Sequence, residues 1–274
     1  MEGHEVIREE HVKEVTRGDP PLECICQGIP PLESHIAMSL AATAGKVIKC
    51  KGQTKCDTPR ACVAEAAVAY KPKVPLVLED ILVAPPQANE VRIKMMNACV
   101  CQSDLYFWKG KDTEKLFPRI LGHEGAGIVE SFGANVIGLK PGDKCIPAWQ
   151  AECQKCSMCK SSRTNICEVF MFNWGSGLMA SDKKTTRFTR ALDGKPIYHF
   201  FGISVFSQYT VVDEACCAKI NNRADLTKIC LLGCGIPTGV GSAWKIAKVH
   251  KSSTVAVFGL GTIGLAVHDS INYF

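Results

Sequence analysis

The pattern of apolar and polar residues distinguishes two stretches in the part of the chain before about residue 236. Residues 1–40 contain several prolines and no sustained period, so we expect an extension with little structure of its own. From about residue 64, short β-rich runs such as 91–95 and 127–130 alternate with glycine and proline turns, of which 139–143 is the clearest. This pattern predicts an irregular, mainly β domain.

The pattern changes again from about residue 236. Apolar residues recur at helical spacing over 238–249, at Val240, Ala243, Trp244 and Ala247. The apolar run 255–258 then predicts a buried strand, and a glycine-rich turn follows it. We therefore predict a mainly β fold that continues into an α/β unit.

Composition excludes several classes of function. A hydrophobic fraction of 46% and a charged fraction of 22% are those of a soluble globular protein. The net charge of +5 comes without any run of lysine and arginine, so we expect no nucleic-acid partner. Residues 1–19 lack the apolar core of a signal peptide, and the apolar run 254–267 is shorter than the roughly 20 residues of a spanning helix. We expect a cytoplasmic protein with no membrane partner.

Four of the sixteen cysteines have the spacing of metal ligands. Cys153, Cys156, Cys159 and Cys167 read C-x2-C-x2-C-x7-C, which lets four thiolates surround one tetrahedral ion. Zn²⁺ suits four soft thiolates and needs no open position when its role is structural. An iron–sulfur cluster and a set of cysteines without a ligand remain the alternatives.

A single histidine is more often a packed core residue than a ligand, and we interpret six of the seven histidines in that way. His123 differs, because residues 122–133 read Gly-His-Glu-x2-Gly-x5-Gly. With the four-cysteine loop and the runs 84–94, 117–120 and 194–200, this stretch resembles the zinc-containing medium-chain alcohol dehydrogenases, in particular the plant branch. The resemblance covers about 64–274. A short stretch at 44–51 is also similar to the family, and an apparent insertion near 52–65 separates it from the rest.

The resemblance implies a GroES-like catalytic domain at 41–235, followed at 236–274 by the start of a Rossmann nucleotide-binding domain that is incomplete. It also implies two zinc ions per chain. One would be structural, in the four-cysteine loop. The other would be catalytic, held by Cys101, His123 and Cys234, with an open fourth position.

Further roles follow from the same resemblance. Ser103 would pass the alcohol proton outward, Asp104 would orient His123, and Glu124 would lie behind the metal. Trp149 would line a pocket for small alcohols or aldehydes, although an ordinary core position explains a tryptophan equally well.

Gly259, Gly261 and Gly264 form a G-x-G-x-x-G turn after the expected strand, which is typical of dinucleotide binding. By resemblance, Thr238 also faces the cofactor NAD. The acidic residue that holds the ribose should come about 20 residues later, beyond Phe274, and Gln102 stands where the family usually has arginine or histidine. We therefore expect weak NAD binding, and we expect the family's homodimer interface to be missing.

Several functions remain open at this point. The first is NAD-linked, zinc-dependent oxidation of a primary alcohol to an aldehyde, with little or no activity in the chain as given. The second is a zinc-binding fragment without catalysis. A glutathione-dependent formaldehyde dehydrogenase is a variant of the first. A zinc-free quinone reductase of the same superfamily is disfavoured, because both sets of zinc ligands are present.

Overall fold

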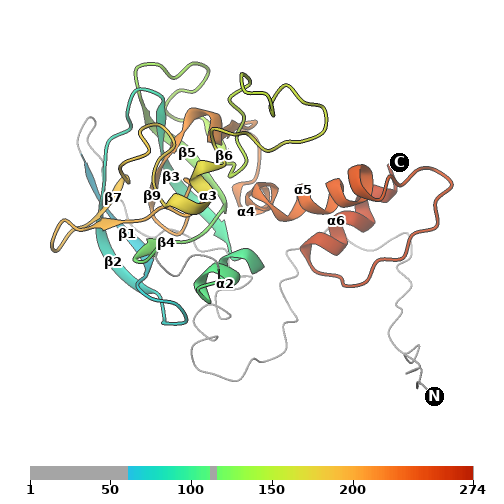
Figure 1. Cartoon of the computed structure of the whole chain (residues 1–274), viewed down its shortest axis with the longest axis horizontal. Helices are drawn as coiled ribbons and strands as arrows, with labels where there is room; N and C mark the ends of the chain where they lie inside the picture. The colour runs from blue at the N-terminus through green and yellow to red at the C-terminus, as the bar shows by residue number, and fades with distance from the viewer. Residues whose placement is uncertain (1–60, 112–115, 274) are drawn as a thin grey trace.

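A computed structural model describes residues 61–111 and 116–273, apart from the side chains of 172 and 173. A β-rich body is followed by a helical arm that extends from one side of it (Figure 1). The expectations for 1–40 and 44–51, and most of the insertion at 52–65, lie outside the described residues. Residues 62–65 are part of a regular strand, β1.

The first sheet has five strands in the order β4-β1-β2-β7-β8. Its longest pair is β1 (Cys62–Ala69) with β2 (Val77–Val83), which run antiparallel. Along β1 buried residues alternate with exposed or half-buried ones, as expected of a strand with one face on a core. The remaining strands are short: β4 (Arg119–Ile120), β7 (Phe188–Arg190) and β8 (Pro196–Ile197).

The second sheet has the order β10-β6-β5-β3-β9 and carries the candidate site at one end. Its central pair is β3 (Glu90–Cys99) and β5 (Glu124–Phe132), which contain the strands predicted at 91–95 and 127–130. The outer strands are β9 (Tyr209–Asp213), β6 (Lys144–Pro147) and β10 (Cys217–Lys219). The expected turn at 139–143 is present, with Gly142 at a φ of 92°.

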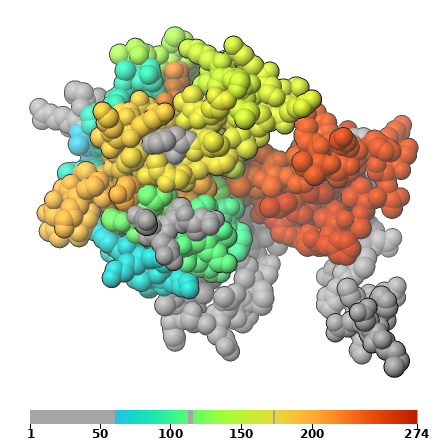
Figure 2. All heavy atoms as spheres, viewed as in Figure 1, coloured from blue at the N-terminus to red at the C-terminus, as the bar shows by residue number. Residues whose placement is uncertain are grey.

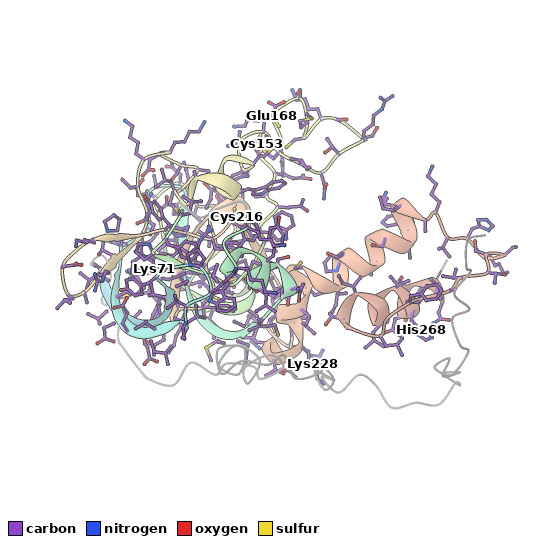
Figure 3. All side chains as sticks on the ribbon, turned by 60° about the horizontal axis from the view of Figure 1, so that its bottom comes forward. Lys71, Cys153, Glu168, Cys216, Lys228 and His268 are labelled. Atoms are coloured by element: carbon purple, nitrogen blue, oxygen red, sulfur yellow. The ribbon has the colours of Figure 1, made fainter. Side chains whose placement is uncertain are left out.

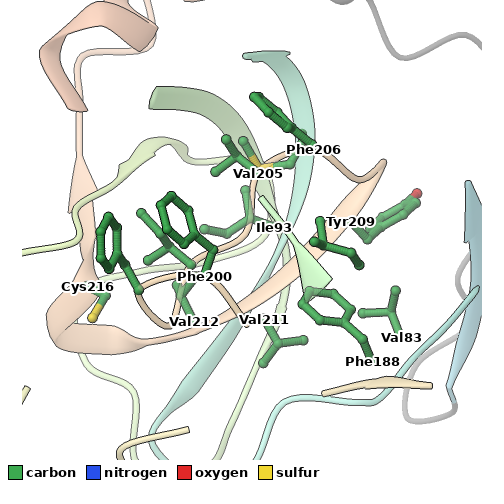
Figure 4. Close-up of a cluster of buried hydrophobic side chains, with 14 of the residues drawn as sticks. Val83, Ile93, Phe188, Phe200, Val205, Phe206, Tyr209, Val211, Val212 and Cys216 are labelled. Atoms are coloured by element: carbon green, nitrogen blue, oxygen red, sulfur yellow. The ribbon is translucent and has the colours of Figure 1, made fainter. Parts of the chain in front are cut away.

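One main hydrophobic core lies between the two sheets. Figure 4 shows part of it, contributed by several strands and by the segment 200–206: Val83, Ile93, Phe188, Phe200, Val205, Phe206, Tyr209, Val211, Val212 and Cys216. The segment just before β9 bridges the sheets, because Ala67 of β1 donates its N–H to Phe206 while Met95 of β3 donates to Gln208, both at 2.9 Å. The body is therefore a barrel-like pair of sheets closed around a single core, as the predicted fold class requires.

The helical arm follows the second sheet. It comprises α4 (Leu226–Ile229), η2 (Cys230–Gly233), α5 (Gly235–Gly241), a π-helical turn η3 (Ser242–Ile246) and α6 (Thr262–Ile271). Three short helical elements lie elsewhere in the described part of the chain: α2 (Gln102–Trp108), α3 (Phe172–Ser176) and η1 (Glu214–Cys216). The helix predicted at 238–249 is confirmed over α5 and η3, which together form one bent helical stretch.

The buried strand predicted at 255–258 is wrong for this structure. These residues form no strand, and Phe258 is 98% exposed. An apolar run becomes a buried strand only when neighbouring strands hydrogen-bond to it and other elements cover its faces. None of the described residues does so here, and the arm lies beside the body rather than inside it (Figure 2).

No single helix within 61–111 and 116–273 is long and apolar enough to cross a membrane. One bent pair, Leu226–Gly233 with Gly235–Ile246, meets the length and composition criteria together, with a bend of 53°.

Candidate metal centre

Cys101, His123 and Cys234 come from three separate parts of the chain and meet at one end of the second sheet. Cys101 follows β3 and caps the short helix α2 (Gln102–Trp108), His123 immediately precedes β5, and Cys234 lies between η2 and α5. Their ligand atoms, with a carboxylate oxygen of Glu124, all lie within 4.8 Å of one another. The structure thus brings together the three ligands that the resemblance implied.

Asp104 holds this arrangement in place from behind. It is almost fully buried, and its carboxylate accepts hydrogen bonds from the backbone N–H of Cys101 at 2.8 Å and of Gly122 at 3.0 Å. The same carboxylate lies 3.1 Å from Nδ1 of His123. A histidine that donates Nδ1–H to a carboxylate presents Nε2 as the ligand atom. The predicted role of Asp104 as the group that orients His123 therefore agrees with the geometry.

The Nε2 atom of His123 is buried and has no hydrogen-bond partner among the described residues. A buried polar atom without a partner costs about 1–3 kcal/mol, so such atoms usually have a ligand or a role. A divalent ion at the meeting point of Cys101 and Cys234 supplies the missing partner. Two thiolates and one imidazole are a donor set that Zn²⁺ accepts readily.

Protonation of the ligand atoms is coupled to metal binding at this site. A hydrogen bond with Cys234, followed by burial, raises the pKa of Cys101 to about 12, while the same hydrogen bond lowers the pKa of Cys234. Burial lowers the pKa of His123, but the Asp104 carboxylate and Cys101 outweigh that effect and raise it to about 10. Cys101 and His123 therefore retain protons that metal binding would release.

Glu124 lies beside the three ligands. It is buried, and its Oε1 accepts a hydrogen bond from the backbone N–H of Gly235 at 2.9 Å. Burial, followed by the nearby Cys101, raises its pKa to about 7. Its position agrees with the expectation that it lies behind the metal, and it connects β5 to the first turn of α5.

Ser103 is also positioned as expected. The thiol of Cys101 donates to the hydroxyl oxygen of Ser103 over 3.8 Å, which is within the range for sulfur. The side chain is half-buried at the start of α2. A hydroxyl group thus lies next to a ligand atom and still reaches toward solvent.

Aromatic rings form a wall next to His123. The ring of Phe201 lies 5.8 Å from that of His123 and 5.3 Å from that of Trp149, and the rings of Trp149 and Trp174 are 5.2 Å apart. Trp149 is half-buried in this wall, so the site has an apolar side where a small organic molecule could pack. Sequence reasoning named Trp149 but missed Phe201 and Trp174, which follow no helical or strand period that could have revealed them.

The four-cysteine loop is a second candidate metal site, and Figure 3 labels its Cys153. The sulfurs of Cys153 and Cys159 are 4.0 Å apart, and those of Cys156 and Cys167 are 3.9 Å apart. A tetrahedron with Zn–S bonds of about 2.3 Å has edges of about 3.8 Å. The spacing of the sulfurs therefore fits a single zinc ion.

Backbone N–H groups point at the sulfurs of this loop. The N–H of Cys156 donates to Cys153 at 3.3 Å, and that of Cys159 donates to Cys156 at 3.4 Å. The latter contact is the main cause that lowers the pKa of Cys156 to about 6. Donors aimed at sulfur stabilise thiolates, which are the form that binds metal.

The glycine turn has the expected shape. Gly259 has a φ of 98°, and a Cβ on Gly264 would lie 1.9 Å from the carbonyl oxygen of Gly259, so no other residue fits at Gly264. Gly261 precedes the first residue of α6. A Cβ on Gly235 would meet the side chain of Thr262 at 2.7 Å, so the first turn of α6 packs directly behind the metal ligand Cys234.

Two further cofactor expectations fall on exposed residues. Thr238 lies on α5, where its hydroxyl donates to the carbonyl oxygen of Cys234 at 2.7 Å. Gln102 is exposed at the first position of α2.

Comparison with known proteins gives a consistent result. Residues 87–222 match the alcohol dehydrogenase GroES-like domain. The chain is 55% identical over 227 residues to an alcohol dehydrogenase class-3 of Zea mays, which covers 83% of the chain and 55% of that protein. It is 51% identical over 230 residues to an alcohol dehydrogenase of Malus domestica, which covers 84% of the chain and 56% of that protein.

Solved structures agree. An alcohol dehydrogenase zinc-binding domain protein from Burkholderia ambifaria superposes with a TM-score of 0.70 at 30% identity, covering 78% of this chain and 56% of that chain. A benzyl alcohol dehydrogenase from Acinetobacter calcoaceticus gives 0.64 at 26% identity, covering 77% and 56%. The chain spans a little over half the length of the curated relatives it matches. With its barrel-like body, its two zinc ligand sets and these similarities, the chain belongs to the zinc-containing medium-chain alcohol dehydrogenase family.

Proposed function

We propose that this protein contributes the metal centre of a zinc-dependent alcohol dehydrogenase, which oxidises a primary alcohol to an aldehyde with NAD as the hydride acceptor. The observation that carries the proposal is the meeting of Cys101, buried Nε2 of His123 and Cys234. A small alcohol or aldehyde is the proposed partner and the cytoplasm the proposed location. Neither a nucleic acid nor a membrane is part of the proposal.

Bound zinc would polarise the alcohol oxygen and lower its pKa, so that the proton can leave near neutral pH. Cys101, His123 and Cys234 would hold the ion, and Asp104 would keep His123 in the correct orientation. The hydroxyl of Ser103, next to Cys101 and half-buried, would accept the proton and pass it toward solvent. Trp149 and Phe201 would pack against the apolar part of the substrate and exclude water.

The nicotinamide would accept the hydride from the alcohol carbon. The Gly259–Gly264 turn would offer backbone to the cofactor phosphates, but residues 255–258 before it form no strand, and Phe258 is exposed. We therefore propose that the 274-residue chain by itself turns over little alcohol, although its zinc centre is complete.

Cobalt substitution tests the proposal without the need for turnover. Co²⁺ in a Cys₂His site gives visible absorption bands that shift when another oxygen ligand binds. Addition of ethanol should shift these bands in the wild-type chain, and the shift should persist in Ser103→Ala if the serine takes no part in binding. Absence of any shift with ethanol would contradict alcohol binding at this centre. A shift only with formaldehyde and glutathione together would indicate the glutathione-dependent activity instead.

A further inference from the structure

A small hydrophobic core, separate from the main one, attaches the start of the helical arm to the second sheet. Its buried members are Ala126, Leu226 and Cys230, and half-buried Met96, Cys99, Ile128, Ile220 and Ile229 pack against them. This core holds the segment that leads directly to the metal ligand Cys234. Because it contains few side chains, it forms a weak attachment compared with the main core.

Two thiols face each other inside this small core. The sulfur of Cys99, at the end of β3, lies 3.3 Å from the sulfur of Cys230, at the start of η2. The Cys230 thiol donates to the carbonyl oxygen of Thr227 at 3.4 Å, so its lone pairs remain directed toward Cys99. Since a disulfide needs about 2.05 Å between sulfurs, the two sulfurs have to approach each other by about 1.2 Å to form one.

We propose that Cys99 and Cys230 are a redox modification site, at which hydrogen peroxide converts the two thiols into a disulfide that joins β3 to η2. Cys99 is half-buried and Cys230 fully buried, so peroxide reaches Cys99 first. Its sulfur attacks one peroxide oxygen and the O–O bond breaks, which gives a sulfenic acid and one water. The Cys230 sulfur then attacks the sulfenic sulfur, the S–O bond breaks, and the hydroxyl leaves with a proton as a second water.

The position of the pair gives this bond a consequence for the metal centre. Cys101 follows Cys99 by two residues, and Cys234 follows Cys230 by four. The disulfide would therefore tie together the two segments that provide both thiolate ligands of the catalytic site. It would also close a loop across a sequence separation of 131 residues, which removes conformational entropy from the unfolded chain.

Peptide mapping tests the proposal on the intact, zinc-loaded chain. The protein is treated with hydrogen peroxide, its remaining thiols are blocked with N-ethylmaleimide, and it is digested without reductant. We expect a cross-linked peptide that contains Cys99 and Cys230. We also expect the Tm of the oxidised protein to rise by several degrees and to return to the original value after dithiothreitol.

Two variants separate this bond from general oxidation. Cys99→Ser should abolish the cross-linked peptide and the Tm shift. Cys217→Ser is the matched control, because it removes a different close thiol contact of the second sheet, that of Cys217 with Cys145, and should retain both effects. The proposal is overturned if wild-type protein yields no peptide joining Cys99 to Cys230, or if Cys99→Ser shows the same Tm shift as wild type.

Discussion

Arg187 donates two parallel hydrogen bonds to Glu90, from Nε at 2.8 Å and from Nη2 at 2.7 Å, and both side chains are buried. Glu90 is the first residue of β3, and Arg187 immediately precedes β7, so this pair connects the two sheets. Removing one partner of a buried ion pair leaves the other charge uncompensated, which costs about 3–5 kcal/mol.

We therefore expect Glu90→Gln to lower the free energy of unfolding by about 1–3 kcal/mol, because Arg187 keeps its ion pair with Asp182 at 3.2 Å and the glutamine amide can still accept one hydrogen bond. Urea unfolding followed by fluorescence measures this change. Asp193→Asn is the control. It weakens the partly exposed pair with Arg190 and should cost less than about 1 kcal/mol. Equal losses of unfolding free energy in the two variants would show that the buried pair stabilises the fold no more than the partly exposed pair.

Stability should fall on acidification partly because of His199. Burial, followed by the positive charges of Arg187 and Arg119, lowers the pKa of His199 to about 3. The unfolded chain, with an ordinary histidine pKa of about 6.5, then binds more protons between these two values, so stability is complete above pH 6.5 and falls as the pH decreases. This histidine contributes a loss of about 1.4 kcal/mol per pH unit over that range.

His199→Gln should flatten the pH dependence, since glutamine can accept the N–H of Arg187 as the Nε2 of His199 does, at 3.1 Å, but does not titrate. The check is the difference in urea unfolding free energy between wild type and variant at pH 7 and pH 5. A difference that stays constant with pH would contradict the assignment. Comparing the two proteins cancels the contribution of the metal ligands, which both retain.

Metal analysis should find two zinc ions per chain, one in each ligand set. Elemental analysis by mass spectrometry of protein purified without chelator gives the count directly. Iron in place of zinc would favour a cluster in the four-cysteine loop, and one zinc or fewer would mean that one of the two sets does not bind.

His123→Ala should remove the zinc of the catalytic set and leave the zinc of the four-cysteine loop, because the two sites share no ligand. The expected zinc content is therefore one per chain, and any dehydrogenase activity should be lost. Cys159→Ser is the complementary variant, which should lose the loop zinc and retain the other. Loss of both ions in His123→Ala would show that the sites depend on each other.

We expect the 274-residue chain not to bind NAD usefully. The glycine turn is formed, but Phe258 just before it and Leu260 within it are exposed apolar side chains. Without a positioned cofactor, the reaction lacks the roughly 7–11 kcal/mol that correct placement of reactants can contribute. Calorimetry of NAD with zinc-loaded protein is the measurement. A micromolar dissociation constant would contradict the prediction and indicate that another chain completes the site.

Local sequence patterns predicted those parts of the structure whose geometry depends on residues close together in the sequence. The four-cysteine loop was recognisable from spacing alone, because its ligands lie within fifteen residues and its geometry follows from the loop. The β3 and β5 strands were recognisable from their β-rich runs between turns. The helix over α5 and η3 was recognisable from its period.

Other features depend on contacts between distant segments. Cys101, His123 and Cys234 are separated by tens of residues, so only the family resemblance identified them as one site. The ring of Phe201 packs against that of His123, and the backbone of Phe201 has a φ of 53°. No periodic sequence pattern predicts such a left-handed conformation. The run 255–258 has the composition of a strand, but composition cannot supply the neighbouring strands that it needs.

The four-cysteine loop has a further consequence for the protein in a cell. The loop lies between β6 and α3, where the chain forms no regular helix or strand. Three of the four cysteines of the loop are only half-buried. Its cysteines pack against the main core, but no backbone ladder holds the loop, so chelation would supply much of what fixes its shape. When zinc is scarce, this surface segment should open first and become the preferred cleavage site for proteases. The lifetime of the protein would then follow the zinc supply of the cell.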